Sequence, residues 1–224
     1  MMTNLFSSFD PSTSMKLSAN WFSMMLPLML ISSKFWMKTS RNQMMINLTT
    51  NILTKELNMS LKNKSKEMIM MMIALFILIL INNLMGLLPY VFTATSHLLT
   101  NLSLALPMWL SIMLFGWIKK TKMMLIHLTP MGTPEPLMPF MVMIEMISNM
   151  IRPISLSVRL TANMITGHLI MSLLETSLTL SNLPILLTQL LLTSFEMAVA
   201  FIQAYVFMML TTLYTSEVNY VNKQ

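Results

Sequence analysis

Two apolar stretches in the C-terminal half of the sequence carry acids, bases and amides. These residues are Glu145, Arg152, Arg159, Asn163 and His168 on the first stretch, and Glu196, Gln203 and Glu217 on the second. Carboxyl and imidazole groups can gain and lose protons, whereas an arginine keeps its charge. The sequence has no nucleophile beside a general base, no metal-ligand spacing and no phosphate-binding glycine loop. The residue types therefore give little support to covalent catalysis, and we expect no cofactor and no metal.

The spacing of these residues pairs them across the two stretches. In an antiparallel helical hairpin, residues that face each other have numbers with a nearly constant sum. The sums are 362 for Arg159 with Gln203, 362 for Glu145 with Glu217, and 364 for His168 with Glu196. Along one helix, Arg159 would lie ~21 Å from Glu145 and ~13 Å from His168. The register therefore predicts two polar entrances at different depths, separated by a central cation.

Arg159 is the residue for which a functional role is the first interpretation. Its sequence neighbours within four residues include no Asp or Glu, so its charge has no partner on its own helix. A charge at the centre of a bilayer costs ~2.5 kcal/mol or more, which indicates function. The other polar residues have structural alternatives, which are a snorkelling or structural cation for Arg152, a core histidine for His168, helix contacts for Asn163 and Gln203, and interfacial helix ends for Glu145 and Glu217.

The composition of the chain identifies the elements that must position these residues. The 224 residues are 55% hydrophobic and 10% charged, with a mean hydropathy of +0.67. Several apolar runs approach the ~20 residues that a membrane-spanning helix needs. We therefore expect an all-α, multi-pass membrane protein with about five transmembrane helices and one interfacial helix. The absence of Cys excludes disulfides, thiolate metal sites and cysteine nucleophiles.

The apolar runs divide one membrane domain, 1–224, into segments. We expect a first span at 19–37, an interfacial segment at 40–66, spans at 67–88 and 98–118, and a hairpin formed by 137–174 and 184–215. A continuous helix over 137–174 would extend ~57 Å, nearly twice the ~30 Å of a hydrocarbon core. The two last helices are therefore either broken, with Pro153 as a candidate position, or steeply tilted.

The basic residues predict the orientation of the chain. With these spans, Lys16 lies on the side of the N-terminus, called side one. Side two receives Lys34, Lys38, Arg41, Lys55, Lys62, Lys64, Lys66, Lys119, Lys120, Lys122 and Lys223. The positive-inside rule makes side two the compartment of synthesis. Because the net charge of +6 sits in short segments between helices, no basic face for nucleic acid is expected. The opening MMTNLFSSFDPSTSMK lacks the features of a targeting presequence, so we expect the apolar segments to direct insertion.

Several stretches resemble subunit a of the F-type ATP synthase in its animal mitochondrial form. The strongest are RLTANMITGHL and, beginning 28 residues after His168, EMAVAFIQAYVFMMLTTLY. MMTNLFSSFDPS, NNLMGLLPYVFTATSHL and GTPEPLMPFMVMIEMISNMIRPISLSVRL are similar too, and only about 42–66 matches poorly. The resemblance implies the mitochondrial inner membrane, with the N-terminus in the intermembrane space and the C-terminus in the matrix.

The resemblance also implies partners and a mechanism. The partners would be a rotating ring of c subunits, the peripheral stalk, other membrane-sector subunits, the bilayer and protons, with no nucleic acid. Arg159 would attract a deprotonated ring carboxylate and separate two half-channels on a subunit that has no ATP-hydrolysing site. The half-channels would be formed by His168, Glu196, Asn163 and Gln203 toward side one, and by Glu145 and Glu217 toward side two. The His and Glu of the first are exchanged relative to bacterial relatives, and Glu217 stands where many relatives carry Asp.

Two other classes of protein stay open at this point. A proton-coupled secondary transporter would need a substrate pocket at broken helices within an inverted repeat, and the sequence shows no internal repeat. A structural subunit of another respiratory complex would account for the apolar runs but not for three polar pairs in one register. Replacing Arg159 distinguishes these classes, because a structural subunit predicts loss of assembly whereas a proton-translocating one predicts loss of coupled transport.

Overall fold

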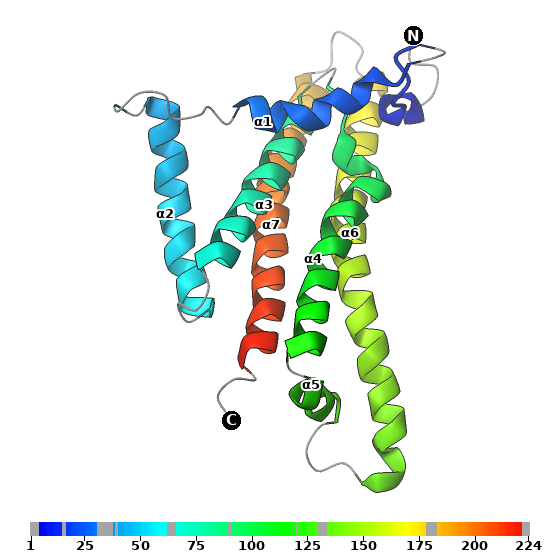
Figure 1. The fold of residues 1–224 in the computed structure, drawn as a ribbon. Coiled ribbons are helices and arrows are strands. Elements are labelled where there is room, and N and C mark those ends of the chain that lie inside the picture. The colour runs from blue at the N-terminus through cyan, green and yellow to red at the C-terminus, as the bar shows by residue number, and fades with distance from the viewer. Residues whose placement is uncertain are drawn as a thin grey trace.

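Helices form all the long elements that the computed structural model describes, over residues 5–14, 17–30, 38, 40–61, 66–88, 91–119, 121–129, 134–177 and 183–220. The α-helices are α1 (Leu26–Leu30), α2 (Arg41–Leu61), α3 (Lys66–Gly86), α4 (Leu98–Lys119), α5 (Thr121–Leu128), α6 (Met138–Ser177) and α7 (Leu183–Tyr220) (Figure 1). Short 3-10 helices are η1 (Leu5–Phe9), η2 (Ala19–Met25), η3 (Ala94–Ser96) and η4 (Glu135–Leu137). Within the described ranges, an isolated bridge between Ser14 and Leu17 is the only β feature. The all-α prediction is confirmed.

Four of the described helices are long and apolar enough to cross a membrane. They cover Glu67–Gly86, Leu98–Lys119, Met138–Glu175 and Pro184–Ser216. These ranges overlap the spans expected at 67–88 and 98–118 and both members of the expected hairpin. The chain is therefore a multi-pass membrane protein, and α6 and α7 are the elements that carry the ionisable residues.

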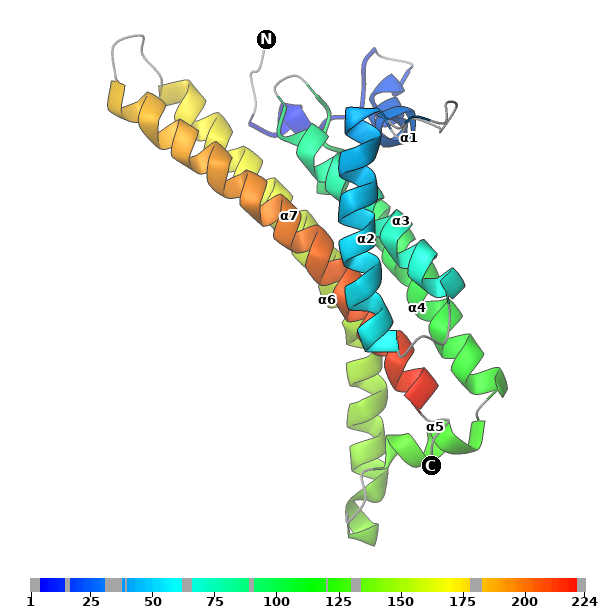
Figure 2. The same ribbon diagram turned by 90° about the vertical axis from the view of Figure 1, so that its left-hand side faces the viewer.

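The two long helices are tilted and continuous. The 40 residues of α6 and the 38 residues of α7 extend ~60 Å and ~57 Å. Pro153 lies inside α6 without interrupting it. A proline there removes one main-chain hydrogen bond and bends a helix, and α6 changes direction along its length in Figure 2, where α7 runs diagonally beside the second half of α6. Of the two alternatives, the structure has tilt with a bend.

A core of apolar and small residues joins α6 and α7 to the helices behind them. In this core Leu156 and Leu160 of α6 pack with Phe207 and Ala204 of α7, Ile79 of α3 and Ala105 of α4. The two alanines allow the helix backbones to come close together, which is the usual way that membrane helices pack. The core therefore fixes the hairpin at the depth of Arg159.

The segment expected to lie at the interface, 40–66, is helical over α2. Its residues Leu53, Leu57 and Leu61 recur every four positions and are buried with Met72 of α3 and Met208 of α7. This stripe packs α2 against α3 and α7, and α2 and α3 lie close together at the end of α2 and diverge toward its start (Figure 1). Its placement relative to the membrane surface stays a prediction.

The first expected span, 19–37, is described only over 19–30. Here η2 and the short α1 lie across the η1 end of the other helices (Figure 1). Because α2 begins at that same end, Arg41 stands there too, and not with the cations of side two as the sequence suggested. Lys66 and Lys119 mark the start of α3 and the end of α4 at the opposite end. Residues 31–37 lie outside the described part of the chain, so the first span stays a prediction.

Candidate functional site

Arg159 projects from the face of α6 that turns away from the core. Leu156 and Leu160 are 7% and 2% exposed, whereas Arg159 is exposed together with Val158 and Ala162. No ion pair or hydrogen bond joins Arg159 to any residue within the described ranges. The neighbouring leucines point into the bundle because helical residues four apart share a face. An intramembrane cation is thereby presented outward, without a partner among the described residues.

Glu196 of α7 packs directly against the backbone of Gly167 on α6. A Cβ atom placed on Gly167 would lie only 2.7 Å from the carboxyl carbon of Glu196 and would also collide with its Oε1. Glycine therefore makes the space that the carboxyl group occupies. The residue numbers of this contact add to 363, within the 362 to 364 expected for the hairpin register.

His168, the residue after Gly167, shares this buried environment. Nε2 of His168 and both carboxyl oxygens of Glu196 are buried, and none has a hydrogen-bond partner within the described residues. Most buried polar atoms in proteins are paired, and exceptions are typical of sites that exchange protons or hold water. The structure thus brings His168 and Glu196 to the same place on the hairpin, at its η1 end.

The amides Asn163 and Gln203 are both half-buried. Asn163 stands one helical turn from Arg159 in the direction of His168, and Gln203 precedes the core residue Ala204. The described contacts include no hydrogen bond between Gln203 and Arg159. Their role as a polar lining stays a prediction, and their placement on the two hairpin helices is compatible with it.

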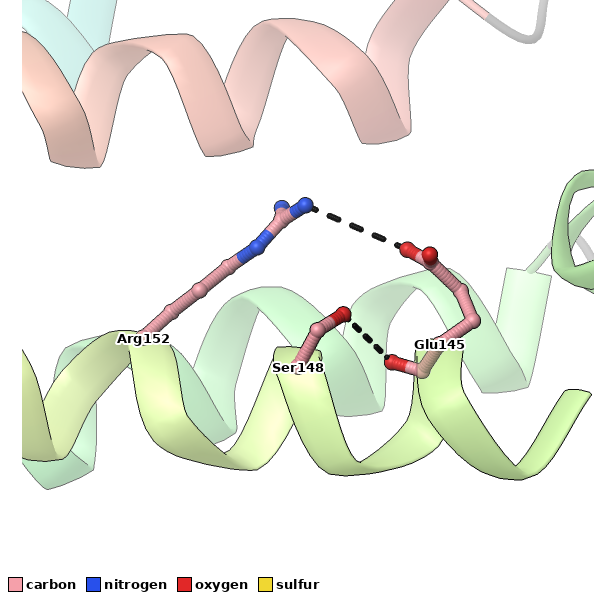
Figure 3. A network of polar contacts seen from close by, with 3 residues as sticks. All are labelled: Glu145, Ser148 and Arg152. Carbon is pink, nitrogen blue, oxygen red and sulfur yellow. Dashed lines mark hydrogen bonds and ion pairs between the residues drawn. The ribbon is translucent and has the colours of Figure 1, made fainter. Parts of the chain in front are cut away.

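The opposite end of the hairpin carries an ion pair. Nη2 of Arg152 lies 3.9 Å from Oε1 of Glu145, and both side chains project from α6 toward α7 (Figure 3). The guanidinium carbon is 5.0 Å from the centre of the Tyr214 ring, a cation–π contact with α7. Ser148 Oγ donates a 2.8 Å hydrogen bond to the main-chain oxygen of Glu145. Arg152 therefore has a defined partner in Glu145, beyond the structural or snorkelling role considered from the sequence.

Glu217 lies on α7, but its side chain is outside the described part of the structure. The expected pairing of Glu217 with Glu145 therefore stays a prediction. At this end the described contact between the helices is the one between Arg152 and Tyr214.

Two buried polar residues outside the hairpin were not singled out as site residues from the sequence. Asn83 of α3 is 1% exposed and Thr95 of η3 is 3% exposed. Both side-chain atoms of Asn83 and the hydroxyl of Thr95 lack a hydrogen-bond partner within the described residues. The feature of the sequence that could have identified Asn83 is an amide inside an otherwise apolar span. These groups are further candidates for contact with ordered water.

The fold and these residues define a class of protein: a polytopic helical membrane protein with ionisable groups toward both ends of one long hairpin and an unpaired arginine on an open face between them. Comparison with known proteins identifies the family. The profile of the ATP synthase A chain matches residues 15–216. The chain belongs to the ATP synthase A chain family, and the resemblance to subunit a is confirmed.

Arthropod relatives match over nearly the full length. Each is an ATP synthase subunit a, and the match covers 100% of every relative. The protein of Artemia franciscana is 51% identical over 221 residues and that of Locusta migratoria 52% over 232 residues, each covering 97% of this chain. The protein of Drosophila melanogaster is 53% identical over 224 residues and covers 98% of this chain.

Proposed function

We propose that this chain is the proton-translocating stator subunit of the ATP synthase membrane sector in the mitochondrial inner membrane. Membership of the ATP synthase A chain family supports a role in proton translocation by that sector and a ring of c subunits as partner. Four helices suited to cross a membrane support the location. The chain conducts protons to and from the ring and takes no part in the chemistry of ATP.

The proposal rests on Arg159, which is exposed and has no partner among the residues that the structure describes. An arginine in an apolar medium needs a counter-charge, and the face around it is made of small or apolar residues such as Val158 and Ala162. Such a face accepts close approach of another helix, whose carboxylate can pair with the guanidinium. Because arginine stays protonated even in a low-dielectric site, the attraction persists through every turn of the ring, which a lysine could not guarantee.

The two ends of the hairpin supply the half-channels. Protons reach a ring carboxylate by Glu196 and His168, with Asn163 and Gln203 as polar lining. The neutral carboxyl group then moves along the lipid face until it reaches the release side near Glu145 and Glu217. His168 is nine residues from Arg159, which is ~13 Å along α6 and too far for direct proton transfer to that depth. Arg159 therefore separates two paths that connect only through the moving carboxyl group.

The orientation follows the distribution of cations and the position of the helix ends. η1 and the end of α7 lie at opposite ends of the molecule (Figures 1 and 2). Lys66 and Lys119 lie at the end opposite η1, which supports placing that end in the matrix. The side-one half-channel would then open to the intermembrane space.

Replacing Arg159 tests the proposal. ATP synthase with Arg159→Ala is expected to assemble, as seen on a native gel, yet to lose ATP-driven proton pumping in inner-membrane vesicles. Passive proton leak is expected to increase, because no charge separates the half-channels. Lys119→Ala, which removes a cation at the end of α4, is the matched control and should pump normally. Normal pumping by the Arg159→Ala enzyme would contradict the proposal and make Arg159 a structural cation.

A further inference from the structure

The ring of Phe9 contacts the imidazole of His168, although the two residues are far apart in the sequence. Their ring centres are 6.2 Å apart and the ring planes are at 88°, a favourable edge-to-face geometry. η1, which ends at Phe9, packs against α6 (Figure 1). Along residues 6–10, Phe9 is half-buried while the others are exposed. The side chain of Phe9 therefore packs η1 against α6 beside His168, the candidate proton-transfer residue.

His97 binds the main chain of the same residue. Its Nε2 donates a 3.0 Å hydrogen bond to the carbonyl oxygen of Phe9, and because a carbonyl only accepts, Nε2 must carry the proton. The His97 ring lies 5.2 Å from the ring of Trp21 and 5.5 Å from that of Phe92. Trp21 and Phe92 are themselves 5.8 Å apart. His97, Trp21 and Phe92 thus form a cluster of three rings. This cluster fixes the imidazole that donates to Phe9.

The chain after Phe9 is tied down as well. The main-chain N–H of Ser12 donates to Oδ1 of Asp10 at 3.1 Å, and Nδ2 of Asn20 donates to the Asp10 carbonyl at 3.4 Å. The hydrogen bond from the Ser12 N–H lowers the pKa of the Asp10 carboxyl, because it stabilises the ionised form. Phe9 is therefore placed by contacts of its ring, its carbonyl and the residue that follows it.

We propose that Phe9 is a positioning residue for His168 and that His97 holds Phe9 in place at the side-one end of the hairpin. This inference rests on the proposed function. Nε2 of His168 has no hydrogen-bond partner within the described residues, so hydrogen bonding through Nε2 does not set the orientation of its ring. The aromatic ring of Phe9 restricts the imidazole ring instead. The same contact covers one side of the imidazole.

Chemical labelling tests the contact without any measurement of transport. Intact ATP synthase is treated with diethylpyrocarbonate, and modification of the peptide that contains His168 is followed by mass spectrometry. Loss of one aromatic contact shifts an equilibrium by about two- to tenfold, and labelling of His168 in the Phe9→Ala enzyme should rise by that factor. Phe6→Ala is the matched control, because Phe6 is in the same 3-10 helix and is 66% exposed. Equal labelling of His168 in the wild-type and Phe9→Ala enzymes would overturn the proposal.

Rescue variants separate positioning from general damage. Phe9→Tyr keeps the ring and His97→Gln keeps a donor near Nε2, so both should retain wild-type labelling and proton pumping. Phe9→Ala and His97→Leu should both increase labelling and slow pumping by a similar factor, with assembly intact on native gels. If Phe9→Tyr fails like Phe9→Ala, or if His97→Leu behaves like wild type, the proposal is wrong. Failure of the proposed function is a different result, because the Arg159→Ala enzyme would then still pump.

Discussion

The two ends of the α6–α7 hairpin hold their ionisable groups in opposite ways. At the η1 end, Nε2 of His168 and both carboxyl oxygens of Glu196 are buried and have no hydrogen-bond partner within the described residues. At the other end, Glu145 forms an ion pair with Arg152, and these side chains are 34% and 31% exposed. One end therefore depends on close packing and the other on charge pairing at a partly open surface.

This difference predicts how well each end tolerates change. A group that is buried without polar neighbours has no substitute when it is removed, because the surrounding side chains offer neither protons nor hydrogen bonds. A group that is one-third exposed can be replaced in part by water, which bridges polar atoms at little cost. The same substitution should therefore be severe at the η1 end and mild at the opposite end.

The largest effect is expected from Glu196→Gln. Removing a proton-transfer group reduces a rate by ~10²–10⁴-fold, and the carboxyl oxygens of Glu196 have no hydrogen-bond partner within the described residues that could take over. Glu145→Gln is the matched substitution at the other end, where water reaches the site and a loss of about tenfold or less is expected. ATP-driven acidification of vesicles by the two enzymes measures both rates. Equal losses would remove the distinction between the two ends.

The next largest effect on proton pumping is expected from Gly167→Ala. In Gly167→Ala, the new methyl group would overlap the carboxyl group of Glu196, which must move. That carboxyl group is the far end of a flexible side chain and can shift at a small cost in stability, so we expect slower proton pumping with little change in the temperature at which the complex dissociates on native gels. Gly86→Ala is the control, because there the nearest atom is a side-chain methyl of Thr93 at 3.0 Å. A Gly167→Ala enzyme with unchanged pumping and stability would show that the carboxyl position is not constrained.

The smallest effect is expected from removing the ion pair between Arg152 and Glu145. Partly exposed pairs contribute ~0–1 kcal/mol and are screened by salt, so Arg152→Gln should lower the stability of the complex slightly, and less at high ionic strength. Thermal dissociation of Arg152→Gln, Glu145→Gln and the double variant forms a cycle that isolates the interaction between the two side chains. Tyr214→Phe keeps the ring beneath Arg152 and is the control. A coupling of several kcal/mol in this cycle would contradict the idea that this end is held weakly.

The helical membrane fold could be predicted from particular stretches of the sequence. The run of apolar residues in α3 and the length of the apolar segments in α6 and α7 predict membrane-spanning helices. In the hydrocarbon core of a bilayer, a single segment can satisfy its main-chain hydrogen bonds only as a helix. The register of the hairpin could also be predicted from the sequence. The predicted register pairs Glu196 with His168, and in the structure Glu196 packs against Gly167, the residue before His168. The same reasoning misplaced Arg41, because α2 begins at the end of the bundle where η2 and α1 lie (Figure 1).

Other features depended on contacts between distant segments. The role of Gly167 as space for a carboxyl group and the packing of Phe9 on His168 each join residues of different elements, whose separation follows no helical period. The sequence by itself determined which segments enter the membrane and that Arg159 lacks a partner on its own helix, because hydrophobicity and local spacing are properties of the chain. Only the tertiary structure decided which face Arg159 occupies and which groups at each end are buried or paired, because burial depends on how the helices pack.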